Sequence, residues 1–141
     1  MSRSEHLLLP RPLYEAMLQQ ARTELPNECC GLLAGVREKD VLRVIACHPL
    51  VNELASPTKF LSDGPSMLAA DRAIREAGHE ILAIYHSHPT SEPIPSRTDL
   101  EWAEYYADVI HFIIGLNDAE PLLRGWWLTE TTYEEAAWRI V

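Results

Sequence analysis

The hydrophobic positions of the chain form two patterns, which are short apolar runs and stripes at helical spacing. Continuous or β-branched apolar runs bounded by turn residues are typical of buried strands. Such runs cover residues 6–9, 29–36, 41–47, 81–85, 109–116, 122–129 and 133–141. The charged tetrad from Arg37 to Asp40 predicts a hairpin turn between two of them. Residues 49–65 form an irregular segment, with a brief strand expected at Phe60.

Three other segments predict helices, because their apolar residues recur at spacings of three and four. The first ends before Pro26, and its apolar face consists of Leu13, Ala16, Met17 and Ala21. The second ends at Gly78, and its apolar face consists of Met67, Ala70, Ile74 and Ala77. The third runs from Arg97 to about Ala107. Helices that interleave with hairpin-like strands predict an α/β or α+β fold, with a mixed central sheet flanked by about three helices.

Length and charge narrow the class of protein. The 141 residues contain no internal repeat, low-complexity tract or long polar linker, so we expect one domain over residues 1–141. Lys and Arg number 12 against 21 Asp and Glu, which gives a net charge of −9. This balance offers no attraction to a phosphate backbone or an anionic membrane, so we expect no nucleic-acid and no membrane partner.

The cysteines and the longest apolar run bear on the cellular compartment. Cys29, Cys30 and Cys47 are odd in number and lack a CxxC spacing, so we expect no disulfide framework and a reducing environment. The most apolar run, at 109–116, is far shorter than the ~20 residues that span a bilayer. These features predict a soluble, cytoplasmic protein, which could form a homo-oligomer.

The segment HSHPTSEPIPSRTD, residues 86–99, carries the strongest chemical signal. His86 and His88 project to the same side of an extended strand, and two such imidazoles can bind one Zn²⁺ ion. Asp99 is the obvious third ligand, which leaves a fourth position for water. Zinc lowers the pKa of a bound water to ~7, so hydroxide becomes available at neutral pH. The connecting segment is stiffened by three prolines, Pro89, Pro93 and Pro95.

Each of these residues also has a purely structural interpretation. His86 and His88 could lie at a sheet edge with satisfied ring nitrogens. Ser96 and Asp99 have the spacing of a capping box, with a serine at the N-cap position and an acid three residues later. The two interpretations of Asp99 are compatible, because the first turn of a helix is a rigid platform for a metal ligand.

The spacing HSHP-x6-S-x2-D from His86 to Asp99 resembles the JAMM motif of the MPN-plus zinc metalloprotease family. That family also has a glutamate on an early strand, and the segment PNECCGLLAG at residues 26–35 is similar to it. The resemblance extends over most of the chain, from the helix at Leu13 to the strand at Val109, and implies a single MPN-like domain. It is closest to the small prokaryotic members of the family.

The resemblance implies a role for each matched residue. His86, His88 and Asp99 correspond to the zinc ligands, with one ion per chain. Glu28 corresponds to the general acid/base, which takes a proton from the zinc-bound water and delivers it to the leaving amine. Taken alone, Glu28 could instead be a solvated acid before a strand. Ser96 corresponds to the residue whose hydroxyl stabilises the developing negative oxygen.

The family also implies a class of substrate. Its members hydrolyse amide or isopeptide bonds next to the C-terminal tail of a ubiquitin-like protein, and some small prokaryotic members act at the Gly-Gly tail of sulfur carriers. We therefore expect a zinc peptidase with such a protein as substrate, and the loop from Asn52 to Asp63 as one wall of its groove. The alternative is a non-catalytic binding module stabilised by zinc, which would have no need of an acid/base at Glu28.

Three local features receive no role from the resemblance. Ser87, between the two histidines, is expected to face away from the metal and to support the sheet. His111 is expected on a strand beside the histidines, as a core or supporting residue. Trp126 and Trp127 adjoin on one predicted strand, so one should face inward and one outward. The outward ring would either pack under the C-terminal strand or form a docking surface.

Overall fold

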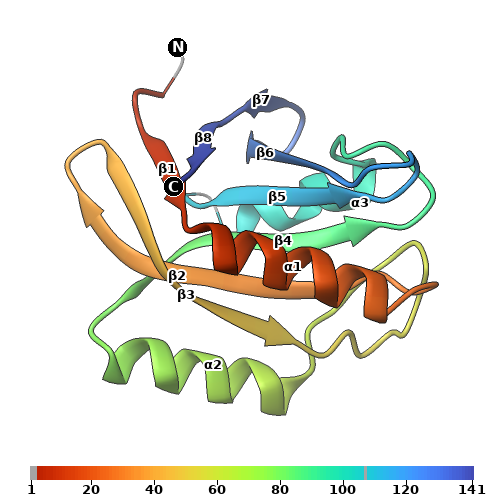
Figure 1. Ribbon diagram of the computed structural model, residues 1–141, viewed down its shortest axis with the longest axis horizontal. Helices are drawn as coiled ribbons and strands as arrows, with labels where there is room; N and C mark the ends of the chain where they lie inside the picture. The colour runs from red at the N-terminus through yellow and green to blue at the C-terminus, as the bar shows by residue number, and fades with distance from the viewer. Residues whose placement is uncertain (1–2, 107) are drawn as a thin grey trace.

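One mixed sheet organises the chain (Figure 1). The computed structural model describes residues 3–106 and 108–141, and within them the strands are β1 (His6–Leu9), β2 (Cys30–Glu38), β3 (Val41–Leu50), β4 (Glu80–His88), β5 (Ile110–Gly115), β6 (Leu122–Leu128), β7 (Tyr133–Glu135) and β8 (Ala137–Ile140). They lie in the order β7-β6-β5-β4-β2-β3-β1-β8. The pairs β1–β3, β1–β8 and β4–β5 are parallel, whereas the other pairs are antiparallel. The predicted mixed sheet is therefore confirmed.

Three α-helices accompany the sheet in the described part of the chain, as predicted. They are α1 (Arg11–Thr23), α2 (Gly64–Glu76) and the short α3 (Arg97–Leu100), which continues as a 3-10 helix, η1 (Glu101–Glu104). Helices α1 and α2 pack on opposite faces of the sheet. Among the described residues, no helix is long and apolar enough to cross a bilayer.

The apolar stripes of the two long helices differ from the prediction at two positions, Ala16 and Ala77, which are both exposed; Ala77 lies just after the last residue of α2. Helix α1 buries Met17, Leu18 and Ala21, whereas Ala16 is exposed, so the stripe is centred closer to Leu18 than predicted. Helix α2 begins where the Asp63 carboxylate accepts a hydrogen bond from the Ser66 N–H at 2.7 Å. It ends before Gly78, whose φ of +72° confirms the predicted glycine after the helix.

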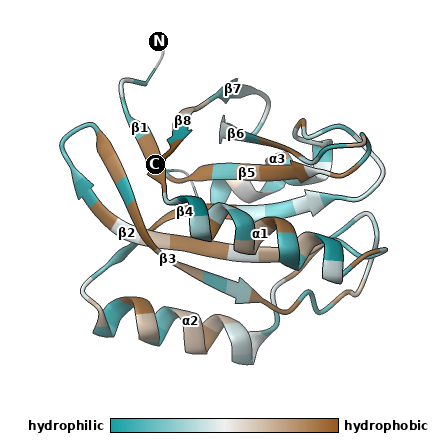
Figure 2. Ribbon diagram, in the orientation of Figure 1, coloured by the Kyte–Doolittle hydropathy of each residue, from teal (hydrophilic) through white to brown (hydrophobic). Residues whose placement is uncertain are grey.

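Alternation along the central strands builds a core on each face of the sheet. Leu33 of β2 and Tyr85 of β4 pack with α1, whereas Leu32 and Ile84 pack with α2. Because both faces are covered, β2 and β5 are hydrophobic along most of their length (Figure 2). The ends of β2 and β4 thus lie on a rigid, doubly covered scaffold.

Three predicted elements need correction. The third helix is regular only from Arg97 to Leu100 and then tightens into η1. The chain turns toward β5 soon afterwards, since the Tyr106 carbonyl lies 3.1 Å from His111 Nε2; Ala107 lies outside the described residues. The predicted C-terminal strand is interrupted at Ala136 and forms β7 and β8. No strand forms at Phe60 within the described residues, where the segment closes instead through an antiparallel bridge between residues 52 and 62.

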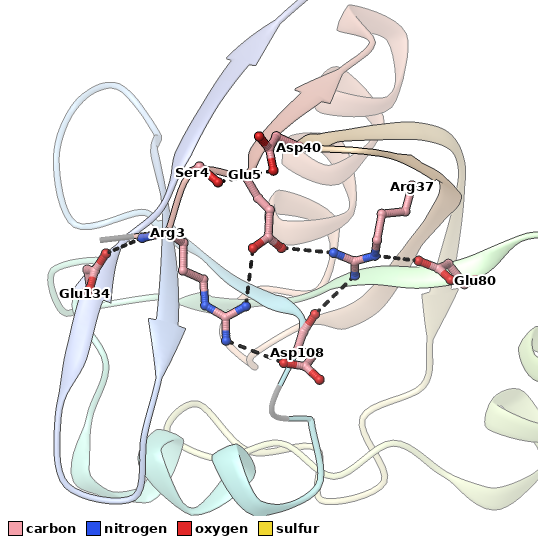
Figure 3. A network of polar contacts seen from close by, with 8 residues as sticks. All are labelled: Arg3, Ser4, Glu5, Arg37, Asp40, Glu80, Asp108 and Glu134. Carbon is pink, nitrogen blue, oxygen red and sulfur yellow. Dashed lines mark hydrogen bonds and ion pairs between the residues drawn. The ribbon is translucent and has the colours of Figure 1, made fainter. Parts of the chain in front are cut away.

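A charged network ties the N-terminal segment to the end of the sheet where β2 finishes and β4 starts (Figure 3). The Arg37 guanidinium lies 3.0 Å from Glu5 and 2.9 Å from Glu80, and Arg3 lies 3.5 Å from Asp108. These residues surround a surface hollow of about 560 Å³. Its arginines are already paired with carboxylates, and the histidines lie at the other end of β4, so we assign it a structural role.

Candidate functional site

His86 and His88 are the last two residues whose side chains lie on one face of β4. The strand is central, with β2 on one side and β5 on the other, and its period of two sends both imidazoles to the same face. Both side chains are buried. The predicted pair therefore lies side by side on rigid backbone, and it is not at a sheet edge.

Asp99 reaches the two histidines from the first turn of α3. The predicted capping box is present: Ser96 Oγ accepts a hydrogen bond from the Asp99 N–H at 3.0 Å, and Asp99 Oδ2 accepts one from the Ser96 N–H at 2.9 Å. The same carboxylate lies 3.2 Å from His86 Nε2 and 3.1 Å from His88 Nε2. The capping box thus holds the carboxylate in place beside the imidazoles, so capping and ligation are compatible here.

The spacing of these three side chains fits a small metal ion. The two Nε2 atoms lie 3.2 Å apart, and each lies 3.1–3.2 Å from an oxygen of Asp99. Ligands at zinc distances of about 2.0–2.1 Å in a tetrahedron would be roughly 3.3 Å apart. Among the described residues, this is the group of His, Cys, Asp and Glu side chains whose ligand atoms lie close enough to hold a metal.

The hydrogen bonds of His88 fix the tautomer that metal binding requires. Its Nδ1 lies 2.8 Å from the Glu92 carbonyl, which only accepts hydrogen bonds, so Nδ1 carries the proton. In the neutral ring, Nε2 then directs a lone pair at the Asp99 carboxylate. Facing acceptors of this kind need a cation or a proton between them, so the chemistry of the donor set fits zinc.

Electrostatics at the cluster also favour positive charge. Burial alone would raise the pKa of Asp99, but attraction to His86 and hydrogen bonds from both imidazoles outweigh it and hold that pKa well below its usual range. Burial alone would lower the pKa of His88, but its hydrogen bond to Asp99 outweighs this and raises the pKa. The carboxylate is therefore ionised at neutral pH and ready to bind a cation.

Glu28 lies two residues before the start of β2, close enough to His86, His88 and Asp99 to interact with them electrostatically. Its side chain is only 4% exposed, and burial raises its pKa to about 7, although the nearby His86 and His88 partly oppose the rise. It is not part of the group of ligand atoms found among the described residues. Glu28 is thus a carboxyl that can exchange a proton near neutral pH beside a candidate metal site.

Ser87 connects the strand of the histidines to the segment of Glu28. Its hydroxyl oxygen accepts a hydrogen bond from the Cys29 N–H at 2.8 Å, and its own N–H donates to the Cys29 carbonyl at 3.2 Å. The side chain is fully buried and lies on the face opposite to the imidazoles. The prediction that Ser87 supports the sheet is confirmed.

His111 lies on β5, paired with Ile84 of β4, so the predicted neighbouring strand is confirmed. Its ring is buried, and Nε2 donates a hydrogen bond to the Tyr106 carbonyl at 3.1 Å. Burial lowers the pKa of His111 to about 4, so the ring is neutral at physiological pH. His111 is therefore a supporting residue of the site face, as predicted.

The two adjoining tryptophans point to opposite faces of β6, as predicted, and both are buried. Trp127 is 6% exposed in the core beside α1, and Trp126 is 5% exposed in a smaller core with Leu128. Trp126 packs against Tyr133 at the start of the predicted C-terminal strand, with ring centroids 5.1 Å apart, so the packing alternative holds and the docking surface does not. Trp126 also acts on the site, because its Nε1–H donates to the Pro93 carbonyl at 3.0 Å.

The Trp126–Pro93 bond braces the segment between the metal-ligand candidates, and we expect Trp126→Phe to weaken it. The substitution leaves the buried Pro93 carbonyl without its donor, which should cost about 1–3 kcal/mol in the free energy of unfolding. Zinc affinity should also fall several-fold, since the next residue back, Glu92, orients His88. Urea unfolding and zinc titration measure both effects, with Trp127→Phe as the matched control. Equal zinc affinity and stability for the two variants would contradict this role of Trp126.

The loop from Asn52 to Asp63 contributes two residues to the site: Phe60, where the sequence predicts only a brief strand, and Asn52, which the hydrophobic pattern did not single out. Phe60 stacks on His86, with ring centroids 4.7 Å apart and an interplanar angle of 22°. The Asn52 side chain is buried and donates a hydrogen bond to the Glu28 carbonyl at 3.0 Å. A lone asparagine in an irregular segment gives no periodic signal, so only its contacts reveal its importance.

Comparison with known proteins agrees with the fold. A family model described as prokaryotic homologs of the JAB domain matches residues 10–129. The desampylase of Haloferax volcanii is 36% identical over 107 residues, which are 72% of this chain and 76% of the relative. The CysO-cysteine peptidase of Mycobacterium tuberculosis is 38% identical over 97 residues, which are 69% of this chain and 65% of the relative.

Two solved structures share the fold over most of its length. The solution structure of a protein from Desulfitobacterium hafniense superposes with a TM-score of 0.86 at 32% identity, covering 96% of this chain and 92% of that one. A Salinibacter ruber protein gives a TM-score of 0.66 at 28% identity, covering 94% and 90%. The mixed sheet and the cluster on β4 and α3 define a JAMM-type hydrolase. More particularly, the chain belongs to the family of prokaryotic homologs of the JAB domain, as its HSHP-x6-S-x2-D motif predicts.

Proposed function

We propose that this protein is a zinc-dependent peptidase or isopeptidase that cleaves an amide bond at the C-terminal Gly-Gly tail of a ubiquitin-like or sulfur-carrier protein. The observation that carries the proposal is a buried carboxyl, Glu28, beside a cluster of three metal-ligand candidates. The names of the relatives, desampylase and CysO-cysteine peptidase, support this class of substrate. We further propose that residues 1–141 act as one domain in the cytoplasm, where the three free cysteines would stay reduced.

His86, His88 and Asp99 would hold the zinc ion, one per chain. When bound, zinc acts as a Lewis acid and lowers the pKa of a coordinated water to ~7. The three side chains supply two neutral nitrogens and one negative oxygen, a donor set that suits zinc and leaves a coordination position open. An open position is the feature that separates a catalytic zinc site from a structural one.

Glu28 would act as the general acid/base. A carboxylate accepts a proton from the attacking water and, once protonated, donates it to the leaving amine. This exchange is most efficient when the pKa lies near the working pH, and burial brings the pKa of Glu28 to about 7. Positive charge at the metal site lowers that value, so the working pKa in the loaded protein lies at or below it.

Ser96 would stabilise the oxygen that becomes negative during attack on the carbonyl. Its Oγ already accepts the hydrogen bond from the Asp99 N–H, which fixes the position of the hydroxyl. Because the oxygen serves there as an acceptor, the hydroxyl hydrogen is available to donate to substrate. Ser96 is also exposed, as a residue that contacts substrate must be. The same side chain can thus cap α3 and serve as an oxyanion donor.

Cleavage of defined tails tests the proposed function. Suitable substrates are a ubiquitin-like or sulfur-carrier protein whose Gly-Gly end is extended by one amino acid, and the same protein joined to a lysine side chain. We expect the zinc-loaded protein to release the carrier with a free Gly-Gly end, detected as a mass change, and an Ala-Ala end to be resistant. Intact tails in all substrates at one zinc ion per chain would overturn the proposed function.

A further inference from the structure

The backbone of Glu28 is held by a loop that is distant in sequence. Glu28 precedes the first residue of β2, so the sheet ladder does not fix it. Instead, its N–H donates to the Ser56 carbonyl at 2.8 Å, and its carbonyl accepts a hydrogen bond from Asn52 Nδ2 at 3.0 Å. Both backbone polar groups of Glu28 are therefore satisfied by the loop at residues 52–62.

The Asn52 side chain, at the start of this loop, makes four hydrogen bonds that hold the loop together. Its Nδ2 donates to the carbonyls of Glu28 and Lys59, both at 3.0 Å. Its Oδ1 accepts from the N–H of Leu54 at 3.2 Å and from the N–H of Leu61 at 3.0 Å. An asparagine amide has two donor hydrogens and two acceptor lone pairs, so all its capacity is used. The partners also fix the orientation of the amide, since carbonyls only accept and N–H groups only donate.

The same loop contacts the metal-ligand candidates at a second point. Phe60 lies next to Lys59 and stacks on the ring of His86. One closed loop thus holds the acid/base on one side and packs against a ligand ring on the other. Its conformation depends on Asn52, which is buried at 7% exposure.

We propose that Asn52 is a positioning residue, which fixes Glu28 relative to the metal centre by clamping the loop at residues 52–62 to the Glu28 backbone. This inference rests on the proposed function, because it gives Asn52 a role in catalysis through Glu28. A carboxylate must lie within hydrogen-bond reach of the proton that it transfers. Misplacement by about 1 Å can cost on the order of 100-fold in rate, so a clamp on the backbone of Glu28 has a large effect on catalysis.

Two substitutions separate the clamp from the folding of the loop. Asn52→Ala removes all four hydrogen bonds. Asn52→Asp keeps an oxygen for the N–H groups of Leu54 and Leu61, but places a second oxygen against the carbonyls of Glu28 and Lys59. We expect both to lower kcat by about 10- to 100-fold while zinc affinity stays within about threefold, because the ligands lie on β4 and α3. The matched control is Thr58→Ala, an exposed position in the same loop.

A double-mutant cycle with Glu28→Gln provides a readout that a general loss of structure would not give. If Asn52 acts through Glu28, Asn52→Ala should lower the residual kcat of Glu28→Gln by less than about threefold. An equal loss of kcat in both backgrounds, or wild-type kcat in both Asn52 variants, would overturn the positioning role.

Amide hydrogen exchange tests the clamp without substrate or metal. In the Asn52 variants, the Glu28 amide should exchange at least about 10-fold faster than in the wild type, whereas the amides of β4 should be unchanged. Wild-type protection of the Glu28 amide would overturn the inference even if kcat falls. Failure of the wild type to cleave any tail would instead count against the proposed function, and the exchange result would still decide whether the clamp exists.

Discussion

Replacing Glu28 by glutamine should lower kcat by about 100- to 10,000-fold while the protein still binds one zinc ion, since general acid/base groups contribute rate factors of this size. The amide has nearly the shape of the carboxyl but cannot take up a proton from water. The ligand candidates lie on β4 and α3, so the metal content should not change. The matched control is Glu53→Gln, which neutralises an exposed carboxylate in the loop beside the site. Rapid cleavage by zinc-loaded Glu28→Gln would remove Glu28 from the mechanism.

The pH dependence of the wild type gives the same prediction in another form. Glu28 must be deprotonated to accept a proton, so kcat/KM should fall as the pH drops through its pKa. Burial raises that pKa to about 7 in the metal-free protein, and bound zinc moves it lower. The acidic limb of the profile should therefore have its midpoint at or below about pH 7, and it should be absent from the residual activity of Glu28→Gln.

The raised pKa also predicts a gain in stability for Glu28→Gln. The folded pKa lies above the unfolded value of 4.5, so the protonated carboxyl favours folding at low pH, and this contribution is lost as the pH rises from about 4.5 through about 7. Above pH 7 the buried carboxylate destabilises the metal-free protein. Glu28→Gln should then be more stable than the wild type by on the order of 1–3 kcal/mol at pH 8, and no more stable at pH 4. Urea unfolding at both pH values measures the difference.

The parts of the site whose geometry depends on residues close together in the sequence could be predicted. His86 and His88 share a face because strands have a period of two, and the Ser96–Asp99 box is a contact within one helical turn. Both follow from short-range geometry. The relation of Glu28 to these residues came only from the resemblance to a family, because β2 and β4 are far apart in the chain and pair in the sheet.

Other features could not be predicted because they depend on packing between distant segments. The alternation along β6 predicts one inward tryptophan but not which one: Trp127 joins the main core, and Arg3 of the N-terminal segment lies 4.1 Å from its ring centroid. The third predicted helix is short because the chain must turn into β5. Asn52 matters through four hydrogen bonds, of which one reaches Glu28 across 24 positions. No hydrophobic period reports contacts of this kind.

Asp99→Asn should lower zinc affinity by about 100-fold or more, because even the loss of an outer-sphere partner costs about 10- to 100-fold. The substitution removes the negative charge that faces both imidazoles, but its amide oxygen can still accept the hydrogen bond from the Ser96 N–H. The start of α3 should therefore persist, and metal-dependent cleavage should be lost at limiting zinc. Zinc titration by competition with a chelator measures the affinity, and unfolding of the metal-free protein measures the stability.

Ser96→Ala is the matched control that separates capping from ligation. It removes the side chain that accepts the Asp99 N–H, which should cost about 0.5–2 kcal/mol in the free energy of unfolding. Zinc affinity should nevertheless stay within about tenfold of the wild type, because Ser96 is not a ligand candidate. If Asp99 served only as a capping residue, Asp99→Asn would bind zinc with the affinity of the wild type. Weak zinc binding by Asp99→Asn together with retained stability would establish that the carboxylate charge is needed for the metal, and that the capping box serves to hold it in place.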